Sequence, residues 1–179
     1  MKSVSEVAAL AEAAHARQVD KIGVPYFEHV RAVAVGLESF GDELVMAGLL
    51  HDVVEDTDWT AEQLLAAGIP ARVVEIVEAV TNQTGMSYEE KIRRITADPQ
   101  ATLVKISDNA HNSHPARAAQ LPADKQERLA VKYRSARAAL WPAASRADIE
   151  AIVKIVNPSL LGELEAHAGT STAAAGEPA

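Results

Sequence analysis

The chain has 179 residues, 48% of them hydrophobic, which is enough for one domain with its own core and too few to expect two. It contains no cysteine, which excludes disulfides, thiolate metal ligands and cysteine nucleophiles, so any metal must be bound through nitrogen and oxygen. The net charge of −8 disfavours nucleic acid as a partner, because surfaces that bind a phosphate backbone normally carry an excess of basic residues.

The sequence favours a cytoplasmic protein without a membrane segment. Glu6 and Glu12 interrupt the Ala-rich start of the chain before a signal-peptide core is reached, and no run of about 18 apolar residues occurs. A small anionic substrate is still compatible with the net charge, provided that a metal and a few local cations neutralise it. No pattern in the sequence indicates an oligomeric state.

Abundant alanine, few aromatic residues and the spacing of glycine and proline predict an all-α fold, a compact helical bundle. Residues 3–18 and 26–39 have the periodicity of amphipathic helices, and a loop over 20–25 that ends in proline joins them. Residues 43–56 are predicted to form one helix that changes from apolar to polar at His51. Further helices are predicted over 61–67, 71–81, 87–97, 99–112, 124–141 and 146–156.

Three of the later helices have well-marked starts. Thr60 and Ser87 are each followed three residues later by Gln or Glu, which is the pattern of a capping box. Asp98 offers an N-cap, and Pro99 fits the first helical position after it.

The C-terminal end has too little hydrophobic content to be held in a fold. The predicted domain therefore covers residues 1–168, and a disordered tail is predicted over 169–179.

Four ionisable residues follow directly on the apolar part of one helix, namely His51, Asp52, Glu55 and Asp56. Burying such groups without partners is costly, so partners are expected, and a cation is an efficient one. The alternative is a solvated helix end that carries a negative cluster. On the dipeptide His51-Asp52 alone, the solvated helix end is the favoured interpretation.

A second polar cluster ends another apolar helix. Asp108, His111 and Asn112 are spaced i, i+3 and i+4, so they lie on one helical face. Each alone would fit a polar helix terminus, but three together after an apolar stretch indicate a site. His29, taken singly, is more typical of a core histidine and gains significance only beside the other two clusters.

Together these residues resemble the HD superfamily and, within it, the hydrolase domain of the Rel/Spo homologues and the stand-alone small alarmone hydrolases. The matching segments are 14–18, 25–29, 49–57, 80–81, 105–108 and 111–112, in the order of the family. The resemblance covers roughly residues 5–140, and the run at 49–57 is its most specific part.

The resemblance implies a metal centre with open positions for water and substrate. Its implied ligands are His29, His51, Asp52 and Asp108. The metal is typically Mn²⁺, although imidazole and carboxylate ligands also accept Fe²⁺, Zn²⁺ or other ions.

The resemblance also implies roles around the metal. Glu55 and Asp56 would orient or deprotonate the attacking water, and Asn112 would contact the sugar or phosphate of a nucleotide. Lys21 and Lys105 are candidate cations near the substrate, and each is also compatible with an ordinary surface or helix-end lysine.

The sequence departs from the alarmone hydrolases at two single positions and in the stretch 107–115, where their Ala-Asp-Arg-Leu-His-Asn-Met-Arg-Thr reads Ser-Asp-Asn-Ala-His-Asn-Ser-His-Pro. Asp20 stands where they usually have an arginine near the guanine, and Asn82 stands where they have a lysine. The metal ligands are complete while the cationic rim is reduced, since an Arg-to-Asp change removes stacking and bidentate donors together.

The sequence therefore predicts a metal-dependent phosphohydrolase that acts on a small anionic nucleotide, preferably a guanosine tetra- or pentaphosphate 3′-pyrophosphohydrolase. An HD-type hydrolase of another nucleotide or phosphoester is the first alternative, motivated by Asp20 and Asn82. A nucleotide-binding HD protein without turnover is the second alternative.

Overall fold

The computed structural model describes the backbone of residues 2–173 and the side chains through residue 167. In this part of the chain the regular structure is helical, apart from an isolated bridge between Val19 and Pro25, so the predicted all-α fold is confirmed. The α-helices are α1 (Val4–Ala14), α2 (Tyr26–Val35), α3 (Asp42–Leu50), α4 (Val53–Asp56), α5 (Ala61–Ala66), α6 (Ala71–Val80), α7 (Tyr88–Ile95), α8 (Pro99–Asn112), α9 (Pro115–Ala118), α10 (Ala123–Leu140), α11 (Arg146–Val156) and α12 (Leu161–Ala173). Short 3-10 helices cover Glu38–Phe40, Trp141–Ala143 and Pro158–Leu160.

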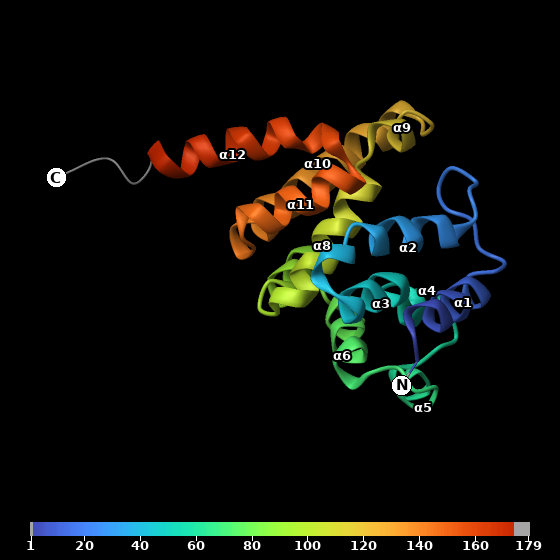
Figure 1. Ribbon diagram of the computed structural model, residues 1–179. Coiled ribbons are helices and arrows are strands. Elements are labelled where there is room, and N and C mark those ends of the chain that lie inside the picture. The colour runs from blue at the N-terminus through green and yellow to red at the C-terminus, as the bar shows by residue number, and fades with distance from the viewer. Residues whose placement is uncertain (1, 174–179) are drawn as a thin grey trace.

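Helix α8 runs through the middle of the molecule and packs against α2, α3, α6, α10 and α11 (Figure 1). Its start is fixed by Asp98, whose carboxylate accepts hydrogen bonds from the first free N–H groups of the helix. Ala101, Val104 and Ala110 are fully buried along it. Because the core holds α8 on several sides, the polar residues at its C-terminal end have fixed positions.

The predicted helix starts are confirmed where a cap could be recognised. Thr60 and Ser87 both form complete capping boxes, and so does Ser3 at the start of α1. Helix α1 ends at Ala14, four residues before its predicted end, and the chain turns at His15. The Gln18 side chain beyond this turn donates to the backbone carbonyl of Asp56 at 2.5 Å.

The helix predicted over 43–56 is interrupted at His51 and Asp52. Helix α3 ends at Leu50, Asp52 has φ −107° and ψ −2°, and α4 begins at Val53. In a continuous helix two successive side chains diverge by about 100°. The interruption instead brings Nε2 of His51 to 3.1 Å from Oδ2 of Asp52, so the prediction of a single helix was wrong at the dipeptide where two polar side chains must meet.

Helix α12 was not predicted, and its first turns are anchored to the rest of the fold. Leu160 and Leu164 are buried, and Arg137 of α10 forms an ion pair with Glu163 at 2.7 Å. Of the tail predicted over 169–179, the backbone through Ala173 belongs to α12, and residues 174–179 lie outside the described residues.

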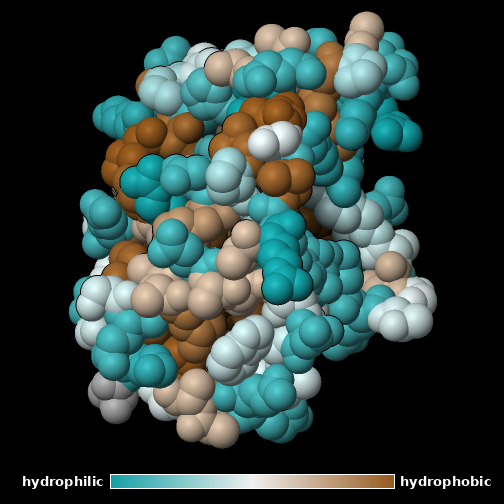
Figure 2. Space-filling model, turned by 90° about the vertical axis from the view of Figure 1, so that its right-hand side faces the viewer, coloured by the Kyte–Doolittle hydropathy of each residue, from teal (hydrophilic) through white to brown (hydrophobic). Residues whose placement is uncertain are grey.

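On the face shown in Figure 2, apolar side chains gather in separate areas between polar ones. Large apolar side chains that stay exposed come from different elements, with Val19 in the loop before α2, Leu65 on α5, Val131 on α10 and Ile155 on α11. Among the described residues, no helix combines the length and the hydropathy needed to cross a bilayer.

The close packing of α2 on α3 depends on Gly48. A Cβ atom at this position would lie 2.9 Å from Cα of Ala34 and 2.9 Å from Cδ1 of Leu37. The backbone of Ala34 cannot yield as a flexible side chain would, so a larger residue must separate the two helices.

We therefore expect Gly48→Ala to lower the free energy of unfolding by about 1–3 kcal/mol, although alanine is the better helix former. Gly162→Ala is the matched control, because a Cβ atom there meets nothing within 4 Å. Urea unfolding of both variants checks this expectation, and equal stability of Gly48→Ala and wild type would contradict it.

Candidate active site

A cleft of about 310 Å³ lies over the C-terminal half of α8, between the loop before α2 and helices α7 and α10. It is lined by all the predicted site residues except His51, which is buried against them. The predicted residues that line it are Lys21, His29, Asp52, Glu55, Asp56, Lys105, Asp108 and Asn112. The structure thus brings together residues that lie far apart in the sequence.

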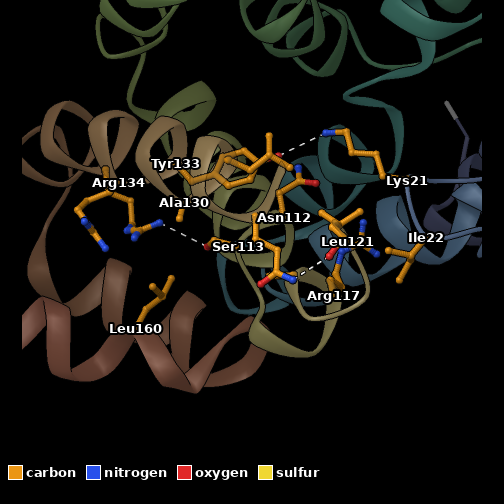
Figure 3. Close-up of a pocket in the computed structure, with 14 residues that line it drawn as sticks. Lys21, Ile22, Asn112, Ser113, Arg117, Leu121, Ala130, Tyr133, Arg134 and Leu160 are labelled. Carbon is orange, nitrogen blue, oxygen red and sulfur yellow. Dashed lines mark hydrogen bonds between the residues drawn. The ribbon is translucent and has the colours of Figure 1, made fainter. Parts of the chain in front are cut away.

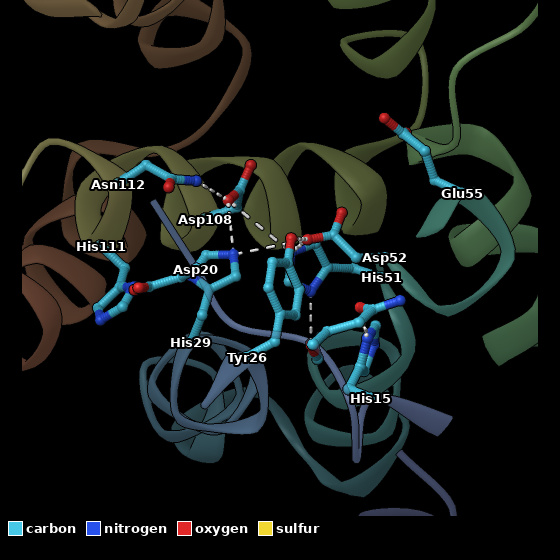
Figure 4. Close-up of polar contacts among 12 residues, drawn as sticks. His15, Asp20, Tyr26, His29, His51, Asp52, Glu55, Asp108, His111 and Asn112 are labelled. Atoms are coloured by element: carbon cyan, nitrogen blue, oxygen red, sulfur yellow. Dashed lines mark hydrogen bonds and ion pairs between the residues drawn. The ribbon is translucent and has the colours of Figure 1, made fainter. Parts of the chain in front are cut away.

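Three of the predicted ligand side chains converge on one point (Figure 4). His29 comes from α2, His51 follows the last residue of α3, and Asp108 comes from α8. One candidate ligand atom from each lies within 4.8 Å of the others. Nε2 of His29 is 3.3 Å and Nε2 of His51 is 3.8 Å from Oδ1 of Asp108. This spacing would let all three contact a single ion.

Asp52 completes the cluster on the side of the cleft. Its Oδ2 atom lies 3.1 Å from Nε2 of His51 and 3.6 Å from Nε2 of His29. The same oxygen accepts a hydrogen bond from the hydroxyl of Tyr26 at 2.6 Å. With a side chain 18% exposed, Asp52 is the most accessible of the four.

Hydrogen bonds on the outer sides of both imidazoles determine which nitrogen faces the cluster. Nδ1 of His51 lies 2.7 Å from the carbonyl oxygen of Gly48 and must donate to it, which leaves Nε2 as the free nitrogen of the neutral ring. This buried Nε2 has no hydrogen-bond partner among the described residues. Nδ1 of His29 lies 2.7 Å from Nδ1 of His111, so one of the two rings donates to the other.

The electrostatics of the cluster favour a positive charge at its centre. Burial raises the pKa of Asp52 and Asp108, but the charges of His51 on the former and Lys105 on the latter outweigh burial and keep both pKa values well below the usual range. Burial lowers the pKa of His51, yet the two carboxylates raise it to about 10, so they favour either a proton or a metal cation at Nε2 of this ring. The donor set of two imidazole nitrogens and two carboxylate oxygens, with an unpartnered Nε2 among them, fits a divalent cation.

Lys105 and Asn112 both contact Asp108. Nζ of Lys105 lies 2.5 Å from Oδ2 of Asp108, and Nδ2 of Asn112 donates to Oδ1. The Lys105 side chain is 13% exposed, so its ammonium neutralises a buried carboxylate and faces the cleft as well. Two of the three predicted substrate-binding residues, Lys105 and Asn112, therefore also position a candidate metal ligand.

Glu55 and Asp56 lie further along the cleft. Glu55 accepts hydrogen bonds from the backbone N–H of Asn82 at 2.9 Å and from the Asn82 side chain, and it pairs with Nζ of Lys91 at 3.1 Å. Figure 4 shows Glu55 set apart from the histidine cluster. Burial and the charge of Asp52 raise the pKa of Asp56. The two carboxylates thus have different surroundings, with Glu55 held by donors and Asp56 beside a like charge.

Lys91 and Tyr26 also line the cleft, and the sequence predicted no role for either. Lys91 is 4% exposed and lies on the buried side of α7. Its position one turn after Tyr88 and one turn before Ile95 places a charge on an apolar helical face, which is a signal that could have singled it out. Tyr26 lies inside a matched segment, but nothing in its spacing indicated a contact with Asp52.

The rim of the cleft carries cations that the sequence did not reveal. Asp20 stands where the alarmone hydrolases that the sequence resembles usually have an arginine, and it forms an ion pair with Arg117 at 2.7 Å. Nζ of Lys132 lies 4.3 Å from the centre of the Tyr88 ring. Burial, followed by the charges of Lys21 and other lysines, lowers the pKa of Lys132, which indicates that these ammonium groups are near one another.

A second pocket of about 120 Å³ adjoins the cleft (Figure 3). Lys21, Asn112, Arg117 and Tyr133 line both spaces. The second pocket has an apolar wall that includes Leu121, Leu129 and Leu160. One ligand could therefore place a polar part in the cleft and a flatter, less polar part in the pocket.

Comparison with protein-family models matches residues 8–149 to the model described as HD domain. The match contains every residue of the candidate metal cluster and of the cleft described above.

Several named proteins are similar in sequence. A guanosine-3′,5′-bis(diphosphate) 3′-pyrophosphohydrolase of Haemophilus influenzae is 34% identical over 134 residues, which is 68% of this chain and 19% of that protein. The guanosine-3′,5′-bis(diphosphate) 3′-pyrophosphohydrolase MESH1 of Danio rerio is 37% identical over 105 residues, which is 54% of this chain and 58% of that protein. The chain spans about a fifth or less of the length of the first curated relatives it matches.

A solved structure has the same fold. It is described as a metazoan orthologue of SpoT that hydrolyses ppGpp and plays a role in starvation responses. The TM-score is 0.68 at 24% identity, and the match covers 84% of this chain and 93% of the other.

The contacts of Glu55 predict a stability effect that is independent of any activity. Glu55→Gln removes the negative charge beside the buried ammonium of Lys91, and we expect it to lower the free energy of unfolding by about 1–3 kcal/mol. Glu89→Gln, on the exposed side of the same helix as Lys91, should leave stability unchanged. Urea unfolding distinguishes them, and equal effects of both substitutions would contradict the assigned pairing.

Proposed function

The chain belongs to the HD-domain family, and from this premise we propose that it is a metal-dependent phosphohydrolase whose substrate is guanosine tetra- or pentaphosphate. It would release the 3′-diphosphate of this nucleotide as pyrophosphate. The observation that carries the proposal is the convergence of His29, His51 and Asp108, with Asp52 beside them, at the floor of a cleft with cations along its rim. The names of the similar proteins support the substrate.

In this proposal the four residues His29, His51, Asp52 and Asp108 hold the metal, with Mn²⁺ as the proposed ion. A divalent metal supplies a Lewis acid that lowers the pKa of bound water and polarises a phosphoryl oxygen. Lys105 and Asn112 keep Asp108 ionised and oriented through their contacts with its two oxygens. Tyr26 does the same for Asp52 through its hydroxyl.

Glu55 and Asp56 are the proposed groups that orient or deprotonate the attacking water. Both line the cleft on the side of Asp52, and the donors from Asn82 and Lys91 hold the Glu55 carboxylate in place. Lys21 and Lys132 would attract and orient the phosphate groups of the substrate, since both are cleft cations, whereas Lys91 is paired with Glu55. The apolar side of the adjoining pocket would receive the nucleobase.

Hydrolysis of another nucleotide or phosphoester is the second candidate. Asp20 and Asn82 favour it, because the alarmone hydrolases that the chain resembles usually carry cations at these positions. A panel of nucleoside mono-, di- and polyphosphates separates the two candidates. Tight binding without turnover under several metals would instead indicate a non-catalytic protein.

The direct test is release of pyrophosphate from guanosine tetraphosphate by chelator-treated protein with and without added Mn²⁺. We expect turnover to depend on the metal and to be lost in Asp52→Ala together with metal affinity. Glu55→Gln should lose turnover and keep the metal, whereas Glu89→Gln should behave as wild type. Absence of pyrophosphate with Mn²⁺, Fe²⁺, Zn²⁺ and Mg²⁺ would reject the proposed substrate.

The contact between His29 and His111 gives a prediction about metal affinity alone. If Nε2 of His29 is a ligand, its Nδ1 carries the proton and donates to Nδ1 of His111. His111→Phe removes this acceptor and should weaken Mn²⁺ binding by about 10-fold to 100-fold. His111→Asn places an oxygen near the same point and should bind nearly as wild type does. Calorimetric titration of the metal-free proteins measures both, and equal affinities of the two variants would contradict the role of His111.

A further inference from the structure

Asp20 is a buried carboxylate in the wall of the cleft. Its side chain is 4% exposed. Oδ1 accepts from the backbone N–H groups of Ile22 at 2.9 Å and Val24 at 3.0 Å, and Oδ2 accepts from Nη1 of Arg117 at 2.7 Å. Asp20 therefore does two things at once, because it closes the loop before α2 and fixes a guanidinium that comes from α9.

Arg117 is placed where the two spaces meet. It lines the cleft and the pocket, and its side chain is 17% exposed. Figure 3 shows it on the side of the pocket nearest Lys21 and Ile22. Asp20 engages Nη1, and the other N–H groups of the guanidinium have no hydrogen bond to another described side chain. Those groups are available to a ligand.

The pairing with Asp20 determines what kind of ligand atom suits Arg117. The carboxylate cancels the charge of the guanidinium but leaves its fork of donors in a fixed orientation. Lys21 and Lys132 are the cleft lysines that form no ion pair with a carboxylate of residues 2–167, so they keep a net charge and suit phosphate. A neutralised, oriented fork suits a pair of neutral acceptors, such as a carbonyl oxygen and a ring nitrogen in one plane.

A buried ion pair is weak evidence for a purely stabilising role, because desolvation offsets most of its attraction. The loop is already closed by backbone hydrogen bonds between Asp20 and Val24 at 2.8 Å and between Gly23 and Asp20 at 3.1 Å. Closing the loop therefore does not require the ion pair between Asp20 and Arg117. Orienting Arg117 toward a ligand gives this ion pair a function of its own.

We propose that Arg117, oriented by Asp20, determines base specificity by donating to the O6 and N7 acceptors of a guanine seated in the adjoining pocket. The inference rests on the proposed function, since it takes the ligand to be a nucleotide. Guanine presents two acceptors on this edge, whereas adenine presents one acceptor and one donor. Arg117 therefore favours guanosine over adenosine substrates.

The first test compares guanosine and adenosine 3′,5′-bis(diphosphate) as substrates under fixed Mn²⁺. We expect Arg117→Met to lower kcat/KM for the guanosine substrate about tenfold to a hundredfold, mainly through KM, and to change the adenosine substrate less than about twofold. Arg117→Lys keeps a charge but not the fork, so it should lose the same preference. Asp20→Asn should lose part of it, and Arg128→Met, on the exposed side of α10, should lose none.

The second test does not depend on turnover. Calorimetric binding of GDP and ADP to the wild type should show a preference for GDP that Arg117→Met abolishes, while metal affinity stays unchanged. Because Arg117→Met leaves the buried carboxylate of Asp20 without its partner, the variant should unfold at a lower temperature, and both affinities are measured below that transition. Failure to hydrolyse any nucleotide would reject the proposed function and leave this preference measurable. Equal affinities of the wild type for GDP and ADP, no binding of either, or equal losses for both in Arg117→Met would overturn the role of Arg117.

Discussion

The structure is organised around two carboxylates that meet two buried imidazoles away from bulk water. Asp52 and Asp108 stay ionised despite burial, and this is possible only where positive charge and hydrogen-bond donors surround them. Lys105 and Asn112 supply these on one side, and Tyr26 supplies a donor on the other. A divalent ion would satisfy the remaining oxygens and the unpartnered Nε2 of His51 at once. The interruption between α3 and α4 serves this arrangement, because it lets His51 and Asp52 approach each other.

The sequence predicted the fold where local chemistry decides it. Capping boxes at Thr60 and Ser87, and the proline after Asp98, marked helix starts because the cap and the capped N–H groups lie within a few residues. The interruption at His51 could not be predicted, because the apolar periodicity continues through it and the reason lies in tertiary contacts. Helix α12 was missed for a related reason, since it is held by the distant Arg137 rather than by a strong pattern of its own.

The candidate site was predictable as far as its residues cluster along the chain or match the family's segments. Polar residues that directly follow an apolar helical run can be recognised in the sequence, as for His51 with Asp52 and Asp108 with Asn112. The distant residues that pair with the side chains of the site cannot be recognised in this way. Arg117 is 97 positions from Asp20, and Lys91 is 36 positions from Glu55, so only the fold shows that these charges face each other. A basic residue on a polar helix looks the same in sequence whether it faces water or a cleft.

Because the sequence does not show which distant charges face each other, the two single positions that differ from the family, Asp20 and Asn82, have a different meaning in the folded chain. Taken as sequence, Asp20 and Asn82 indicate a cleft that lacks two cations. In the folded chain, Asp20 holds Arg117 at the cleft wall, and Asn82 shares Glu55 with Lys91. The potential felt by a ligand depends on where charges lie in space and not on which segment carries them. An anionic nucleotide therefore remains compatible with the rim, and in our proposal Asp20 bears on which base is accepted rather than on whether phosphate is attracted.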